Sequence, residues 1–190
     1  MKKIVVASGN KGKIREIKQI LSDCEIIPCA DLGFTDEIIE DGNTFFENAL
    51  IKAKTVSQAL NLPALADDSG LCVDALNGMP GIYSARYAGD GDDEHNNQLL
   101  LKNLEGEKNR KAKFVCCLVY YDVNGDIITT DGETHGEILY KAEGENGFGY
   151  DPIFYSLDLK KSMGIASAEE KNTISHRFRA LAKLKEKLSK

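Results

Sequence analysis

Two neighbouring carboxylates after an apolar run are the first residues whose types suggest chemistry. Asp67 and Asp68 follow Ala64-Leu65-Ala66 and precede Ser69-Gly70. Ligand crevices of α/β sheets lie at the ends of strands, so two acids there favour a functional site; the alternative is a solvated turn. Because side chains alternate along a strand, only one of the two acids faces a given side. One carboxylate that faces a ligand can bind Mg²⁺ or accept a proton from water.

A second group of residues has the composition of an anion-binding turn. Ser8-Gly9-Asn10-Lys11-Gly12-Lys13 follows the apolar run Ile4 to Ala7 and leads into a helix predicted from about Lys13 to Leu21. Glycines let backbone N–H groups approach an anion, and a helix N-terminus favours negative charge. Lys13 opposes the helix dipole there, which a bound phosphate would explain. The spacing is not that of a Walker A loop.

Two further positions suggest recognition of a ligand. Phe148 lies between Gly147 and Gly149, where it is either a core anchor or a platform on which a base stacks. His176 and Arg177 place positive charge at the start of a predicted helix, where acids are preferred. The alternative for this pair is an exposed basic turn.

The elements that must position these residues alternate between strands and helices. Capping-box spacing predicts helices after Thr44 and Ser167, and Asn124-Gly125 predicts a hairpin. Interleaved strands and helices with a hairpin in the middle indicate an α/β fold with a mixed sheet. Strands are predicted at Ile4–Ala7, 64–66, 71–73, 113–122 and 126–134.

Length and composition describe an ordinary globular protein. The 190 residues suggest a single domain, 1–190, or two lobes that share one core. The formal net charge of −6 argues against a nucleic-acid polymer or an anionic membrane as partner. No run approaches the ~18 apolar residues of a membrane helix. Five cysteines without a C-x-x-C pair predict unpaired thiols in a reducing compartment, so a cytoplasmic location is expected.

Six motifs occur in a fixed order along the chain. They are Ser8-Gly9-Asn10-x-x-Lys13-x-x-Glu16, Phe45-x-Glu47-Asn48-Ala49-x-x-Lys52-Ala53, Ala66-Asp67-Asp68-Ser69-Gly70-Leu71, Gly81-Ile82-Tyr83-Ser84-Ala85-Arg86-Tyr87, Gly147-Phe148-Gly149-Tyr150-Asp151-Pro152 and Ser175-His176-Arg177. In these motifs and their order the sequence resembles, from Lys3 to about Leu184, the inosine triphosphate pyrophosphatases, the dITP/XTP pyrophosphatases that clear deaminated purine nucleotides.

The resemblance implies a fold and an activity. The expected fold is a mixed, elongated central sheet flanked by helices, with two lobes and an active-site cleft between them. The expected reaction is Mg²⁺-dependent hydrolysis of ITP, dITP and XTP between the α- and β-phosphates, which yields a monophosphate and pyrophosphate. A homodimer is also implied.

The resemblance further implies roles for single residues. Asp68 matches the catalytic carboxylate, which would orient or deprotonate water and help to hold the metal. Glu40 is the candidate for the second metal ligand, with Asp41 and Glu37 as alternatives. Substrate-binding positions are matched by Ser8, Gly9, Asn10, Lys11, Gly12, Lys13 and Lys52 for the phosphates, by Ser69, and by Phe148, Gly149, Tyr150, Asp151, Lys171, His176 and Arg177 for the base and ribose.

Two other functions stay open at this point. A related pyrophosphatase could act on modified pyrimidines or methylated bases, with the same phosphate-binding residues and a different base pocket. A non-catalytic nucleotide-binding protein is the alternative from another class, and the intact Asp68 argues against it, because a pure binder does not need a carboxylate that faces a polyanion. The choice between Mg²⁺ and Mn²⁺ is also open.

Overall fold

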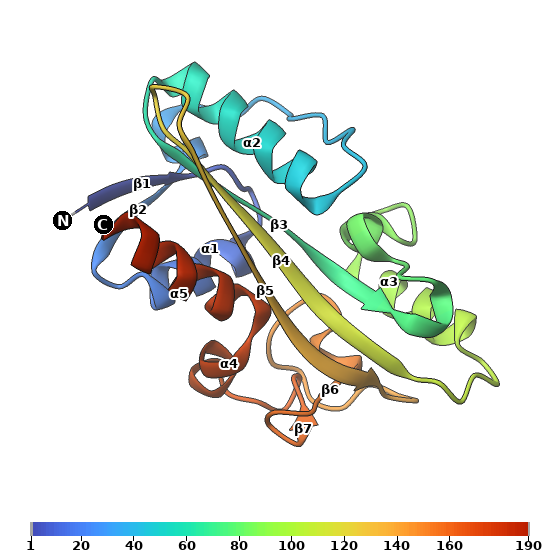
Figure 1. Ribbon diagram of the computed structural model, residues 1–190. Helices are drawn as coiled ribbons and strands as arrows, with labels where there is room; N and C mark the ends of the chain where they lie inside the picture. The colour runs from blue at the N-terminus through green and yellow to red at the C-terminus, as the bar shows by residue number, and fades with distance from the viewer. Residues whose placement is uncertain (1, 190) are drawn as a thin grey trace. The chain divides into compact units, whose positions relative to one another are not determined.

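The computed structural model describes residues 2–189 (Figure 1). It divides into two compact units. Met1 and Lys190, at the limits of the predicted domain, lie outside the described residues. Unit 1 comprises Met1–Asp68, Cys116–Gly132 and Arg177–Lys190, and unit 2 comprises Ser69–Val115 and Glu133–His176.

The secondary structure is α/β with a mixed sheet, as predicted. Seven strands follow the order β2-β1-β3-β4-β5-β6-β7. β1 pairs in parallel with β2 and β3, whereas β6 pairs antiparallel with β5 and β7. The strands are β1 (Lys2–Val6), β2 (Cys24–Pro28), β3 (Ala64–Val73), β4 (Lys111–Tyr121), β5 (Ile127–Ile138), β6 (Phe154–Ser156) and β7 (Lys161–Ser162). The helices are α1 (Lys11–Ile20), α2 (Phe45–Leu60), α3 (Asp93–Asn103), α4 (Ala168–Ile174) and α5 (His176–Leu188), with short 3-10 turns at 29–32, 74–76, 81–86 and 151–153.

Helices cover both faces of the strands in unit 1 (Figure 1). α1 and α5 pack on one face and α2 packs on the other, so β1 is apolar at every position from Ile4 to Val6. The alternation of the strands sorts the core into two layers. The α1/α5 layer contains Ile4, Val6, Leu65, Cys116, Leu118 and Leu181, and the α2 layer contains Val5, Ala64, Ala66, Val119, Ala53 and Val56.

β3 is one unbroken strand, so the alternative of a solvated turn at Asp67-Asp68 is wrong. Both acids are buried. Asp67 is two residues from Leu65 and shares its α1/α5 face, whereas Asp68 shares the α2 face with Ala66. The strand therefore delivers one carboxylate to each layer of unit 1.

β1 ends before it reaches the two acids. Its pairing with β3 stops at Val6 and Leu65, and Ala7 N–H donates the last bond of this edge to the Leu65 carbonyl at 2.8 Å. The chain then turns away at Ser8 to begin α1. The next carbonyl on the same edge, that of Asp67, is left for partners other than a strand.

Unit 2 has its own core and its own helix caps. Leu71, Leu100, Phe114 and Phe154 belong to one buried cluster. The capping box predicted at Ser167 is present: its hydroxyl accepts from the backbone N–H of Glu170, and the Glu170 carboxylate accepts from the backbone N–H of Ser167. This box starts α4, the helix that carries Lys171.

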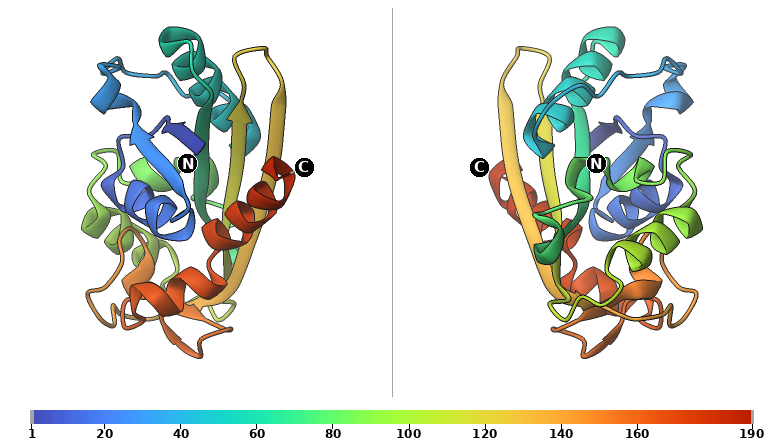
Figure 2. Two further views of the ribbon diagram at one scale, coloured as in Figure 1. Left: turned by 90° about the vertical axis from the view of Figure 1, so that its left-hand side faces the viewer. Right: turned by 90° about the vertical axis from the view of Figure 1, so that its right-hand side faces the viewer.

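Several predicted boundaries differ from the structure. α1 begins at Lys11 because Asn10 is its N-cap and accepts from the backbone N–H of Lys13. The β4–β5 hairpin lies where predicted (Figure 2), but its turn spans Asp122–Asp126, and positive φ occurs at Gly125 and not at Asn124. Within residues 2–189, no helix combines the length and hydrophobicity needed to cross a membrane.

Candidate active site

The Asp67 carboxylate is the centre of a buried ion cluster in unit 1. The Arg177 guanidinium donates from Nε to Asp67 Oδ2 at 2.7 Å and also pairs with Glu16. Lys13 Nζ lies 2.9 Å from Asp67 Oδ1. On the same face, the Cys116 thiol donates to Asp67 Oδ2 at 3.2 Å. Residues from α1, β3, β4 and α5 thus meet on one carboxylate.

These charges keep the buried Asp67 ionised. Burial by itself would raise the pKa of Asp67, but the charges and hydrogen bonds of Arg177 and Lys13 hold that pKa well below its ordinary value. The neighbouring Asp67 raises the pKa of the Arg177 guanidinium in turn, against the effect of burial. Asp67 and Arg177 are therefore both charged at neutral pH.

The backbone carbonyl of Asp67 links this cluster to the other face of β3. It accepts from Lys13 Nζ at 3.3 Å and from Lys52 Nζ at 3.0 Å. The two ammonium groups occupy the edge of β3 that β1 leaves unpaired. Lys13 and Lys52, both predicted to contact phosphate, are thus brought to the same point of the strand.

Asp68 belongs to a second set of charges, on the α2 side. Asp68 Oδ1 accepts from Lys52 Nζ at 3.0 Å, and the same Nζ lies 2.9 Å from Glu40 Oε2. Of the three candidates for a second metal ligand, Glu40 forms an ion pair with Lys52, whereas Asp41 and Glu37 are exposed. Asp68 Oδ2 is buried and has no hydrogen-bond partner among residues 2–189.

Burial makes Asp68 a stronger base than an exposed aspartate. Burial raises the pKa of Asp68, and although Lys52 and Lys13 lower it and Glu40 raises it further, the pKa stays above its ordinary value. Lys52 has a raised pKa because the charges of Asp68 and Glu40 outweigh its own burial. The ammonium is therefore held in the charged form beside both carboxylates.

The turn that precedes α1 is ordered by its own side chains. Ser8 Oγ accepts from the backbone N–H of Asn10, and the first turn of α1 contains no acid. The N–H groups at a helix start have no partner within the helix and favour an anion. Gly9, Lys11 and Gly12 belong to this turn and to the first residues of α1.

In unit 2, Asp151 is the centre of a smaller cluster. Lys171 Nζ lies 2.6 Å from Asp151 Oδ2, and the backbone N–H of Phe148 donates to the same oxygen at 2.9 Å. The Lys171 ammonium is 4.7 Å from the centroid of the Phe148 ring. Three residues predicted to bind the base are thus brought together.

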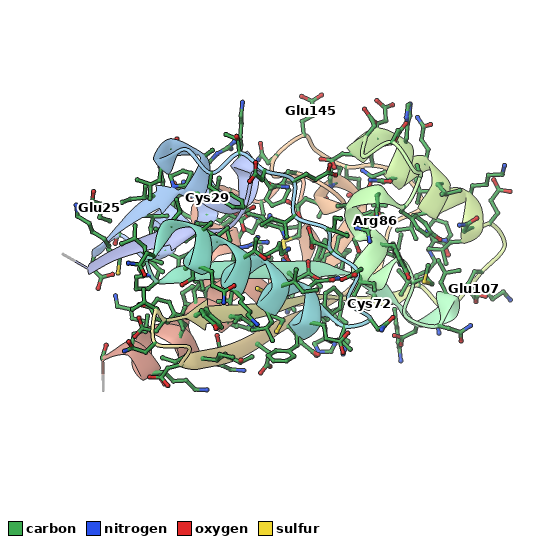
Figure 3. The ribbon with its side chains drawn as sticks, turned by 90° about the horizontal axis from the view of Figure 1, so that it is seen from above. Glu25, Cys29, Cys72, Arg86, Glu107 and Glu145 are labelled. Atoms are coloured by element: carbon green, nitrogen blue, oxygen red, sulfur yellow. The ribbon has the colours of Figure 1, made fainter. Side chains whose placement is uncertain are left out.

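Glycine is required at 147 in this cluster. Gly147 has φ +77°, and a Cβ there would lie 2.1 Å from Asp151 Oδ2. Any other residue at this position would therefore push the Asp151 carboxylate away from Phe148. Glu145, in the same loop, points away from the ribbon and does not join the cluster (Figure 3).

Gly149 and Tyr150 hold the loop in place through backbone and hydroxyl contacts. The backbone N–H of Gly149 donates to Asp93 at 2.8 Å, and its carbonyl accepts from Asn97 at 3.1 Å. The Tyr150 hydroxyl donates to the Ser84 carbonyl at 2.6 Å. These two predicted substrate contacts therefore have structural roles within unit 2.

The remaining predicted residues have separate positions. The buried His176 ring stacks on Phe114 with 5.0 Å between centroids. Ser69 follows Asp68 in β3 and is half-buried. None of the five cysteines forms a disulfide bond, as predicted; Cys29 and Cys72 are labelled in Figure 3.

Comparison with known proteins identifies the family. The model of the Ham1 family matches residues 4–187. The chain belongs to the Ham1 family. Of the solved structures, the Ham1 protein of Staphylococcus aureus has a TM-score of 0.89 at 46% identity and covers 99% of this chain and 98% of its own. A Ham1 protein of Coxiella burnetii has a TM-score of 0.90 at 40% identity, over 100% of this chain and 99% of its own.

Curated relatives of this Ham1 chain carry the name dITP/XTP pyrophosphatase. One from Bacillus anthracis is 48% identical over 99% of this chain and 96% of its own length. One from Haemophilus influenzae is 48% identical over 98% of both chains. The resemblance deduced from the six motifs is thereby confirmed.

The sequence motifs of this Ham1 chain do not indicate the centre of the unit 1 cluster. Asp67 is predicted only as the neighbour of Asp68, and Glu16 has no predicted role. The signal that could have identified Asp67 is its position two residues after Leu65, because side chains two apart in a strand share a face, here that of the α1/α5 layer. Arg177 is predicted to contact the base or ribose, but its guanidinium donates to the carboxylate of Asp67 and forms an ion pair with Glu16.

We expect the substitution Asp67→Asn to destabilise the protein by about 3–5 kcal/mol at pH 7, because it leaves buried cations uncompensated. The lowered pKa of Asp67 means that its contribution is complete above the unfolded value of about 4 and is lost as the pH falls through the folded value. Urea unfolding should therefore show a difference from wild type that shrinks below about pH 4.

The control is Asp131→Asn, which removes the exposed partner of Lys183. It should change the free energy of unfolding by less than about 1 kcal/mol. Equal effects of the two substitutions at pH 7 would contradict the central role of Asp67.

Proposed function

We propose that this chain is a nucleoside-triphosphate pyrophosphatase that hydrolyses ITP, dITP and XTP to the monophosphate and pyrophosphate with Mg²⁺. It would clear deaminated purines from the nucleotide pool of the cytoplasm. Membership of the Ham1 family and the names of its relatives support the class of reaction. The observation that carries the proposal is Asp68, a buried carboxylate with a raised pKa. One of its oxygens accepts from Lys52, and the other has no hydrogen-bond partner among residues 2–189.

Asp68 is the general base of the proposed reaction. A carboxylate with a raised pKa accepts a proton from water more readily than an ordinary aspartate does. Oδ1 is oriented by Lys52, which leaves Oδ2 as the oxygen that can hold the attacking water. The attack displaces pyrophosphate from the α-phosphorus.

The charges of unit 1 alone do not neutralise a triphosphate. Three cations (Lys13, Lys52 and Arg177) and four carboxylates (Glu16, Glu40, Asp67 and Asp68) are connected, and three positive against four negative charges leave a net −1. A nucleoside triphosphate adds about four negative charges, so a divalent cation is needed to stabilise the charge that develops on the phosphates.

Asp68 and Glu40 are the residues that would hold Mg²⁺. Among residues 2–189 no group of three or more His, Cys, Asp and Glu side chains is arranged to hold a metal ion. Mg²⁺ is commonly bound through one or two carboxylates together with substrate phosphates. Lys52 Nζ already brings the Asp68 and Glu40 carboxylates to one cation, so this pair fits Mg²⁺. When bound, the ion would polarise the phosphates.

The cluster at Asp151 is the proposed site of base recognition. The ring of the half-buried Phe148 offers a stacking surface, and Lys171 and His176 offer donors. Inosine and xanthosine present a 6-oxo acceptor where adenine has a 6-amino donor. A site that donates to this oxygen rejects the wrong analogue by roughly 10⁴-fold, because its donor is otherwise left unpaired. GTP must be rejected at its 2-amino group.

A homodimer and a single functional domain over 1–190 are part of the proposal. Met79 and Tyr83 are exposed in unit 2 and would suit an interface between two copies.

The proposal is tested by measuring pyrophosphate release with Mg²⁺ from ITP, XTP, dITP, ATP and GTP side by side. We expect strong preference for the first three. Release without this preference would favour the alternative of a pyrophosphatase with other bases as substrates. Binding without release from any of them would favour a non-catalytic nucleotide-binding protein and overturn the proposal.

The substitution Asp68→Asn should lower kcat by about 10²–10⁴-fold, because the general base is lost. Nucleotide affinity, measured by equilibrium binding, should stay within a few-fold of wild type. The control is Asp74→Asn, an exposed aspartate in unit 2, which should leave kcat unchanged. Wild-type turnover in Asp68→Asn would refute its role as the base.

The substitution Phe148→Leu should raise KM for ITP while changing kcat less, because stacking of a base on an aromatic ring is worth about 1–3 kcal/mol. Steady-state kinetics with Tyr140→Leu as the control tests this, since Tyr140 is the more exposed aromatic of the same unit. If both variants shift KM equally, Phe148 is a core anchor and not a stacking surface.

A further inference from the structure

The ammonium of Lys52 uses its whole donor capacity on protein oxygens. Nζ lies 2.9 Å from Glu40 Oε2, 3.0 Å from Asp68 Oδ1 and 3.0 Å from the Asp67 carbonyl. A lysine ammonium has three N–H donors, so each of these oxygens can take one. Lys52 is buried, so water does not readily replace an acceptor that its ammonium loses.

The three bonds of Lys52 differ in how easily they can be given up. The Asp67 carbonyl is fixed in β3, and Asp68 is buried in the same strand. Glu40 lies outside any helix or strand, and 31% of its side chain is exposed, so it can be hydrated when the bond breaks. Breaking the bond to Glu40 therefore costs the least free energy when the ammonium binds a new acceptor.

We infer that Lys52 is an internal counter-ion that keeps a free divalent cation away from Asp68 and Glu40 until a triphosphate arrives. This inference rests on the proposed function. Without nucleotide, the ammonium neutralises the two carboxylates and repels a second cation. A phosphate oxygen offers the ammonium a replacement for Glu40, and this frees Glu40 to bind, together with the neighbouring Asp68, a cation that enters with the nucleotide. Lys52 thus selects the metal–triphosphate complex over the free metal.

The test is a titration of nucleotide-free protein with Mn²⁺, in which electron paramagnetic resonance measures the unbound ion. Replacing the ammonium by the uncharged side chain in Lys52→Met should tighten Mn²⁺ binding at least tenfold relative to wild type. The matched control is Lys54→Met, which removes an exposed lysine of the same helix and should not change binding. Binding in Lys52→Met that is no tighter than in wild type overturns the inference.

A second variant tests whether the gain comes from the carboxylate pair. In Lys52→Met/Glu40→Gln the tighter binding should be lost, because one of the two carboxylates is neutral. Retention of the gain in this double variant would place the ion elsewhere and overturn the inference. If Lys52→Met does not fold, Lys52→Gln gives the same comparison, since its amide can still donate to the Asp67 carbonyl.

Melting temperatures give an independent measurement. Lys52→Met should melt below wild type in EDTA, because two carboxylates then lack a cation, and saturating Mn²⁺ should raise its melting temperature more than that of wild type. An equal rise in both proteins would contradict the inference.

The metal titration requires neither nucleotide nor turnover, so the two proposals can fail separately. Pyrophosphate release by wild type, together with unchanged Mn²⁺ binding in Lys52→Met, rejects only the role of Lys52 as counter-ion. Tighter Mn²⁺ binding in Lys52→Met, without release from any nucleotide by wild type, rejects only the proposed reaction.

Discussion

Successive side chains of a β-strand must point to opposite faces, and β3 carries carboxylates at two successive buried positions. Each face of unit 1 must therefore supply cations to a buried acid. α1 and α5 do so for Asp67 with Lys13 and Arg177, and α2 does so for Asp68 with Lys52. Each of the three helices packed on the strands thus contributes a cation to one of the two buried acids.

This arrangement shifts the pKa values of the two carboxylates in opposite directions. Asp67 is buried, which raises its pKa, but the charges and hydrogen bonds of Arg177 and Lys13 lower that pKa by more, so Asp67 serves as a permanent charge. Asp68 shares one ammonium with Glu40, so burial prevails and its pKa rises. The same residue type in adjacent positions therefore gives one anchoring group and one group suited to proton transfer.

In unit 2 a buried carboxylate is likewise compensated by a cation, in a smaller cluster. Asp151 receives Lys171 and the backbone N–H of Phe148, which fixes the aromatic ring beside an ammonium. The close approach at Gly147 shows how little space this arrangement leaves. In both units a buried carboxylate orients the groups around it, so the residues proposed to contact phosphate and base are held before any ligand binds.

The α/β class, the capping box at Ser167, the β4–β5 hairpin and the family could all be predicted from the sequence, because periodicity, local capping and ordered motifs are properties of the chain itself. The same patterns indicated Asp68 and Lys52 as candidate site residues. What these residues contact became known only from the folded structure. That Asp67 receives Arg177 across 110 residues, and that Lys52 bridges Asp68 and Glu40, depends on which helix packs on which face. Spacing along the chain does not encode that choice, because burial and compensation of charge are settled only when distant segments meet.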